Sequence, residues 1–142
     1  MNDDAVLLRL ARAYHSSVSL FERETGITAS KWRTLYVLGM YGSCTQKQLA
    51  EVIRADPGLI TRALKDLEAK GLVRRKSDPA NNRFNQVSLL PDGKRMLDDG
   101  LKARKNFLKL MLKGISKQEE IAFSSVLDRI AANCANAGSA VQ

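Results

Sequence analysis

The sequence has only two cysteines, a single histidine and no long apolar run in its 142 residues. Cys44 and Cys134 stand at no metal-ligand spacing, which argues against a zinc site, and we expect both to be buried or half-buried thiols in a reducing cytosol. No apolar run reaches the roughly 18 residues that a membrane-spanning helix needs. The acidic start, MNDD, also differs from the basic start of a secretory signal. We therefore expect a cytoplasmic protein with no membrane partner.

Signatures of an enzyme are also missing. The sequence has no phosphate-binding glycine loop and no convincing order of Ser, His and Asp. Its acidic pairs, such as Asp98 with Asp99, are adjacent in sequence, so on a helix they point away from each other and do not form a general acid/base pair. We expect neither catalysis nor a metal or other cofactor.

Positive charge is what the sequence has in excess. Its 23 Lys and Arg residues outnumber 15 Asp and Glu, which gives a formal net charge of +8. A surface this basic favours a polyanionic partner, either nucleic acid or an anionic membrane. The 44% of hydrophobic residues is typical of a folded globular chain.

Apolar residues recur at helical spacing over most of the chain, and glycine or proline marks many boundaries. We predict helices over residues 4–24, 30–41, 45–53, 57–70, 91–112 and from 116, with strands over 72–77 and 84–90. The predicted fold class is therefore mainly α with a small β-hairpin. The helix over 30–41 is apolar on most sides and should lie in the middle of the protein. The first helix and the last two carry apolar stripes that we expect a second copy of the chain to cover.

The middle of the chain has the order of a helix-turn-helix. Thr45 and Gln48 form a capping-box pattern that begins a short helix. After a tight turn, Asp56 can cap the next helix and Pro57 suits its first position. In that second helix, polar residues lie on the face opposite to Ile60, Leu64 and Leu67. This is the pattern of a DNA recognition helix.

The polar face of the second helix has the chemistry that DNA contact requires. Gly58 permits a close approach to the duplex, and Thr61 can bond to a base edge or a phosphate. Arg62 can donate two hydrogen bonds to guanine, whereas Lys65 suits a phosphate. The alternative is that these side chains form an ordinary solvated helix face.

A predicted hairpin follows directly, as a wing does in winged helix-turn-helix proteins. Its first strand carries Arg74, Arg75 and Lys76, which suit phosphate contacts or serve as edge charges that prevent aggregation. Residues 78–83 form a polar turn, and Arg83 at this turn suits the negative potential of a narrow minor groove.

The segment from Thr45 to Gly93, TQKQLAEVIRADPGLITRALKDLEAKGLVRRKSDPANNRFNQVSLLPDG, resembles the core of the MarR family of bacterial repressors, most clearly at LITRALKDLEAKGLVRRK. The flanking helices are similar to the family layout as well. The resemblance implies one domain over 1–142, with a winged helix-turn-helix part over 28–90 and dimerisation helices over 4–24 and 91–138. It also implies a homodimer that binds a palindromic operator, often released by a small aromatic ligand.

Two positions depart from the family pattern. Asn81 stands where the family usually has an aspartate, so the charge that would pair with Arg83 is missing and the wing is softer. Leu90 stands where the family has a threonine that can cap the long helix, and Pro91 and Asp92 partly compensate for it. We expect DNA binding to survive both changes.

Together, the motif and the resemblance predict two sets of binding residues. Those predicted to contact double-stranded DNA are Thr45, Gln46, Pro57, Gly58, Leu59, Thr61, Arg62, Lys65, Arg74, Arg75, Asn81, Asn82 and Arg83. Those predicted to bind a small aromatic acid or phenol are Arg12, His15, Trp32, Arg33 and Tyr36. The aromatic residues of the second set equally suit a plain core, and a lone helical histidine is more often a packed or surface residue.

Two rival functions remain open at the level of sequence. Cys44 precedes the helix-turn-helix, where a thiol near a helix start can be activated, so the chain could be a redox-sensing repressor. The softened wing at Asn81 also suits an interaction adaptor that has lost DNA binding.

Overall fold

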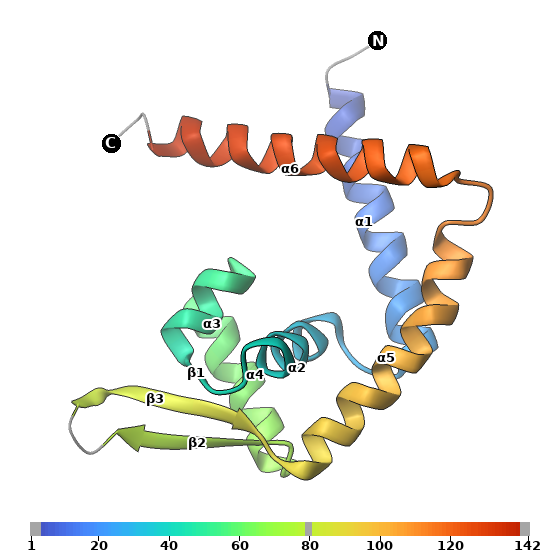
Figure 1. Cartoon of the computed structure of the whole chain (residues 1–142). Helices are drawn as coiled ribbons and strands as arrows, with labels where there is room; N and C mark the ends of the chain where they lie inside the picture. Colours follow the sequence, from blue (N-terminus) through green and yellow to red (C-terminus); the bar gives the residue numbers. More distant parts are fainter. Residues whose placement is uncertain (1–3, 79–80, 140–142) are drawn as a thin grey trace. The chain divides into compact units, whose positions relative to one another are not determined.

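The computed structural model describes the backbone of residues 4–78 and 81–139 and the side chains of residues 5–77 and 86–138. Its helices are α1 (Asp4–Thr25), α2 (Ala29–Tyr41), α3 (Gln46–Ile53), α4 (Pro57–Ala69), α5 (Pro91–Met111) and α6 (Lys117–Ser139) (Figure 1). Its strands are β1 (Cys44–Thr45), β2 (Val73–Asp78) and β3 (Asn81–Leu89), in one antiparallel sheet of order β1-β3-β2. The predicted fold class is confirmed.

The helices begin and end within one residue of the predicted bounds, and both predicted capping boxes form. The Thr45 hydroxyl accepts the Gln48 backbone N–H at 3.1 Å, and the Gln48 side chain accepts the Thr45 N–H at 2.8 Å. Ser116 and Glu119 make the same reciprocal pair before α6. Gly26 ends α1 with a φ of 71°, in the left-handed region that favours glycine.

The start of α4 differs from the predicted cap. Asp56 occupies the capping position, but its side chain makes no capping hydrogen bond. Its backbone carbonyl instead accepts the N–H groups of Leu59 and Ile60, at 3.0 and 3.2 Å. Pro57 takes the first helical position as predicted, and its missing N–H group is no loss there because that position has no acceptor within the helix.

The sheet contains more strand than the sequence predicts. β1 is too short for an alternating pattern to reveal, and it forms because Cys44 and Thr45 pair with Val87 and Gln86 of β3. The hairpin also extends further, to Asp78 on one strand and from Asn81 on the other, so the polar turn predicted over 78–83 is wrong for residues 78 and 81–83. Backbone pairing needs no apolar side chains, so it continues into polar sequence. Residues 79–80 lie outside the described residues.

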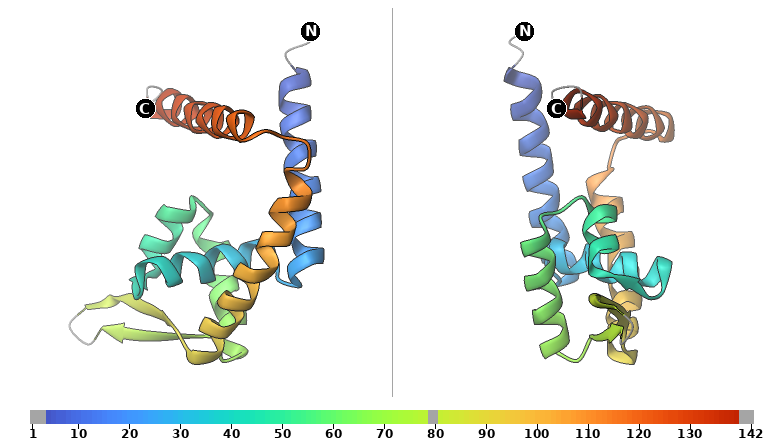
Figure 2. Two further views of the ribbon diagram at one scale, coloured as in Figure 1. Left: turned by 45° about the vertical axis from the view of Figure 1, so that its right-hand side comes forward. Right: turned by 90° about the vertical axis from the view of Figure 1, so that its left-hand side faces the viewer.

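The chain divides into two compact units, Met1–Phe107 and Leu108–Gln142. The core of the first unit consists of side chains exposed by less than 2%, chiefly Leu35, Leu38, Leu49, Leu64, Leu67, Val73 and Val87. As predicted, α2 is central, because it buries residues on several sides and contacts both α3 and α4. Figure 2 shows the ribbon of α2 beside those of α3 and α4. In the second unit, by contrast, large apolar side chains of α6 such as Phe123 stay exposed. None of the described helices is both long and apolar enough to span a bilayer.

Two glycines of α5 permit close packing within the first unit. A Cβ atom on Gly93 would overlap the backbone carbonyl of Leu72, which is held in place by the N–H of Leu90 at 3.0 Å. A Cβ atom on Gly100 would overlap the indole ring of Trp32. The helix therefore lies against the root of the hairpin at one glycine and against α2 at the other.

The change Gly93→Ala should lower the free energy of unfolding by about 1–3 kcal/mol, because a backbone carbonyl cannot move aside as a flexible side chain can. Urea unfolding followed by circular dichroism measures the effect. Gly138→Ala is the matched control, since a Cβ there meets no atom within 4 Å and alanine favours a helix. Equal stability of Gly93→Ala and the unmodified protein would contradict the close packing.

Candidate nucleic-acid interface

A tight turn at residues 54–56 joins α3 to α4. Arg54 adopts the left-handed conformation, with φ 55° and ψ 45°, and donates its N–H to the Ala50 carbonyl. The Ala55 N–H also donates to that carbonyl, at 3.2 Å. A non-glycine residue in this region is uncommon and here produces the sharp reversal of the chain. The predicted helix-turn-helix is therefore formed.

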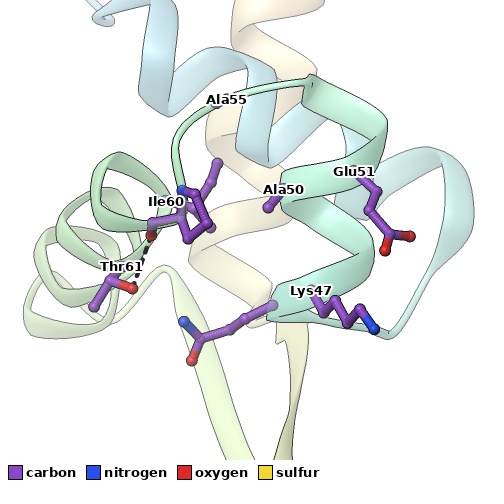
Figure 3. Close-up of a pocket in the computed structure, with 8 residues that line it drawn as sticks. Lys47, Ala50, Glu51, Ala55, Ile60 and Thr61 are labelled. Carbon is purple, nitrogen blue, oxygen red and sulfur yellow. Dashed lines mark hydrogen bonds between the residues drawn. The ribbon is translucent and has the colours of Figure 1, made fainter. Parts of the chain in front are cut away.

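An open hollow of about 500 Å³ lies between the two helices. Its lining consists of Gln46, Lys47, Ala50, Glu51, Ala55, Pro57, Ile60 and Thr61. Figure 3 shows Ala50 and Ile60 pointing toward each other across the helix pair, whereas Lys47 and Glu51 point away. Gln46 and Pro57, both predicted DNA contacts, thus lie at the same opening between α3 and α4. Thr45, the cap of α3, is half-buried beside them.

The two faces of α4 are arranged as the sequence predicts. Its inward face is buried and consists of Ile60, Ala63, Leu64 and Leu67. Its exposed residues include Pro57, Gly58, Leu59, Arg62 and Lys65, while Thr61 is half-buried. The hydroxyl of Thr61 donates to the Pro57 carbonyl at 3.0 Å. Arg62 and Lys65 therefore present their charges to solvent, whereas the hydroxyl proton of Thr61 is already engaged.

The wing, formed by β2 and β3, separates its basic residues by face. Arg74 and Lys76 are exposed, and Arg75 between them is half-buried, because successive strand residues point to opposite faces. The side chains of Asn81, Asn82 and Arg83 lie outside the described residues. The backbone places these three residues at the start of β3.

Glu68 binds Arg75 and so joins α4 to β2, a contact that sequence analysis missed. The Arg75 guanidinium donates to both carboxylate oxygens of Glu68, from Nη2 at 3.0 Å and from Nε at 3.3 Å, and the Arg75 backbone N–H donates at 3.1 Å. The hydrogen bond from the guanidinium is the main cause that lowers the pKa of Glu68, and it raises the pKa of Arg75. The sequence feature that could have predicted this ion pair is a glutamate near the end of α4 followed by an arginine on the inward face of the next strand.

Of the candidate effector residues, Trp32 and Tyr36 belong to an aromatic cluster of the first unit. Trp32 is buried, with ring centroids 5.6 Å from Phe21 and 6.0 Å from Tyr36. Phe21 also meets Phe107 edge-on at 5.4 Å. Trp32 is thus a core residue, whatever its part in ligand binding, while Tyr36 is only half-buried.

A basic side chain contacts this cluster at Tyr36, and the other basic candidates lie on α1 and α2. The guanidinium of Arg104, which sequence analysis did not select, lies 5.5 Å from the centre of the Tyr36 ring. Arg33 donates to the hydroxyl of Tyr14 at 3.4 Å, and the Tyr14 ring lies 5.6 Å from His15. Arg12 is exposed on the same helix as His15. The sequence alone could not reveal the contact between Arg104 and Tyr36, because α5 begins some fifty residues after the end of α2.

The two cysteines differ from each other. Cys44 is buried, as expected, and desolvation by burial raises the pKa of its thiol. Cys134 is exposed, so the expectation that it is buried or half-buried is wrong for the single chain. The apolar face of α6 to which it belongs is uncovered there. Within the described ranges, no three His, Cys, Asp or Glu side chains gather as a metal site requires.

Comparison with known proteins identifies the relatives of this chain. The model of the MarR family matches residues 27–84. Over 116 residues the chain is 34% identical to the uncharacterized HTH-type transcriptional regulator YdgJ of Bacillus subtilis (strain 168), an alignment that covers 82% of this chain and 71% of that protein.

Several solved structures share the fold. BpsR of Bordetella bronchiseptica, whose DNA binding is regulated by 6-hydroxynicotinic acid, matches with a TM-score of 0.83 at 23% identity over 89% of this chain and 98% of that one. A mutant MarR from E. coli complexed with operator DNA matches with a TM-score of 0.81 at 20% identity, over 92% of this chain and 99% of that one. The organohalide-sensing regulator RdhR-CbdbA1625, bound to 2,4-dichlorophenol, matches with a TM-score of 0.86 at 19% identity, over 94% of this chain and 82% of that one. Identities this low establish the fold alone.

The change Glu68→Gln should lower the free energy of unfolding by about 1 kcal/mol at neutral pH, because the amide cannot form the charged pair with Arg75. The figure is small because the Glu68 side chain is 39% exposed and solvent screens the pair. Since folding lowers the pKa of Glu68, the stabilisation is full above the ordinary glutamate pKa of about 4.3 and is lost as pH falls through the lowered value.

Urea unfolding at pH 7 and pH 3 measures this dependence. The difference between Glu68→Gln and the unmodified protein should shrink at pH 3. Glu51→Gln, an exposed glutamate on α3, is the control and should have little effect at either pH. A difference that is the same at both pH values would show that charge does not stabilise the pair.

Proposed function

The chain belongs to the MarR family of transcriptional regulators, and from that premise we propose that it is a homodimeric repressor that binds a palindromic operator and is released by a small aromatic acid or phenol. One observation carries the DNA-binding part: an exposed face of α4 that carries Arg62 and Lys65, next to a wing with exposed cations. Two such recognition helices would enter successive major grooves, about one helical turn apart. Occupation of a promoter would then repress transcription.

The proposed DNA contacts follow from exposure and charge. Arg62 would recognise guanine, and Lys65 and Arg74 would bind phosphates. Thr45 and Gln46 would approach the backbone from the start of α3, and Asn81, Asn82 and Arg83 from the wing. Arg75 would have to exchange its partner Glu68 to reach a phosphate, which makes it the least favoured contact of the set.

Exposed apolar side chains support the homodimer. In α1 and in the second unit they include Val6, Leu7, Leu8, Leu10, Leu110, Met111, Ile115, Ile121, Phe123, Val126 and Ile130. Soluble monomers rarely expose apolar surface so extensively, so we propose that a second copy covers it. The proposed organisation therefore keeps a winged helix-turn-helix part over 28–90 and dimerisation helices over 4–24 and 91–138.

The proposed effector follows from the relatives and from the aromatic cluster. BpsR responds to 6-hydroxynicotinic acid and RdhR-CbdbA1625 binds 2,4-dichlorophenol. In this chain, half-buried Tyr36 offers an aromatic wall, and Arg33 and Arg104 offer charges for a carboxylate or phenolate. Trp32, His15 and Arg12 complete the candidate set. An effector bound there would act by favouring a spacing of the recognition helices that does not fit DNA.

The rival functions have less support. A redox sensor needs a reactive thiolate, whereas burial raises the pKa of Cys44 and keeps its thiol protonated. An interaction adaptor needs no basic recognition face, whereas α4 presents two exposed cations.

Titration of the purified protein on its own upstream DNA and on random DNA, at two salt concentrations, tests the proposal. We expect tight, promoter-selective binding that weakens steeply with salt, because phosphate contacts release counterions. Binding without selectivity at either salt would overturn the repressor function and favour the adaptor.

The change Arg62→Ala should weaken binding to the selected promoter by about 1–3 kcal/mol, because guanine recognition would be lost. Size-exclusion chromatography should give an unchanged oligomer. Lys70→Ala, an exposed lysine directly after α4 that is outside the proposed DNA contacts and the dimerisation helices, serves as the control for loss of charge alone. Unchanged promoter affinity of Arg62→Ala would remove Arg62 from base recognition.

A further inference from the structure

Leu59 is an apolar residue on the exposed face of α4, which also carries Arg62 and Lys65. It is the third residue of α4, and 54% of it is exposed. The inward face of the helix is already filled by Ile60, Ala63, Leu64 and Leu67, so the core does not require it. Its exposed neighbours are Gly58, directly before it, and Arg62, one turn further on. A single exposed leucine is ordinary on most surfaces, but the first turn of a recognition helix is the part that reaches base edges.

The first turn of α4 offers few polar groups to a base edge. Pro57 has no N–H group, and Gly58 has no side chain. The hydroxyl proton of Thr61 is engaged by the Pro57 carbonyl at 3.0 Å. Leu59 is therefore the large side chain that this turn presents, and what it presents is apolar. The apolar group on a major-groove base edge is the C5 methyl of thymine.

We propose that Leu59 contacts the methyl group of a thymine in each half-site and so sets part of the operator sequence. The proposal rests on the proposed DNA-binding function. Residues 59 and 62 are three apart, so they lie on the same side of the helix, separated by about 4.5 Å along its axis. Base pairs are spaced by about 3.4 Å. The thymine recognised by Leu59 therefore lies within about two base pairs of the guanine recognised by Arg62.

Deoxyuridine tests the contact, because it removes the methyl group of thymine and keeps its base pairing. The probe is a duplex that the unmodified protein selects from a pool of randomised DNA, in which each thymine is replaced by deoxyuridine in turn. Fluorescence anisotropy measures the affinity of the unmodified protein, of Leu59→Ala and of Val52→Ala. Val52 is the matched control, an apolar side chain of α3 that is similarly exposed.

For the unmodified protein and for Val52→Ala, we expect deoxyuridine at one thymine per half-site to weaken binding about fourfold, the effect of one apolar carbon leaving its contact. Leu59→Ala should bind the thymine and deoxyuridine duplexes equally. Sensitivity that persists in Leu59→Ala, or the absence of any sensitive thymine in a selected duplex, would overturn the contact and leave the repressor function standing. Failure of the unmodified protein to select any sequence would overturn both.

Discussion

The recognition helix and the wing share one apolar core, and the rest of the interface depends on this. Leu64 and Leu67 of α4, Val73 of β2 and Val87 of β3 are almost wholly buried in the first unit. Burial of each such side chain contributes about 1.5–3 kcal/mol, and interiors packed this closely resist small displacements. The proposed contact of this face with a rigid duplex would need that resistance. The exposed residues of α4 can be polar because the buried ones determine where the helix lies.

Electrostatic contacts add precision to this apolar framework. The pair between Glu68 and Arg75 connects the end of α4 to β2 through three hydrogen bonds, including one from the backbone. The strand therefore has a basic residue directed to α4 between two that face solvent. The net positive charge of the chain does not distinguish the cation that stabilises the fold from those available to DNA. A cation that is paired within the protein has less attraction left for a phosphate.

Helix α2 contacts the aromatic cluster and also α3 and α4, which carry the proposed DNA-binding face of the first unit. Its Trp32 and Tyr36 belong to the cluster, while other residues of the same helix pack on α3 and α4. In the proposed mechanism this helix is the element through which an effector would move the recognition helix. The close approach of Gly100 to Trp32 makes α5 part of the same packing, so a shift of either helix would require a shift of the other.

The sequence by itself determined the helices, their capping boxes and the polar face of α4, because these depend on residues three or four positions apart. It also predicted the helix-turn-helix through the order of cap, turn and proline. Tertiary structure decided what depends on distant residues: the strand β1, which exists only because Cys44 pairs with Val87, and the length of the hairpin. It also decided that Glu68 holds Arg75 and that Arg104 lies over Tyr36. Pairing between segments far apart in sequence leaves no periodic signal in either segment, which is why these contacts needed the fold.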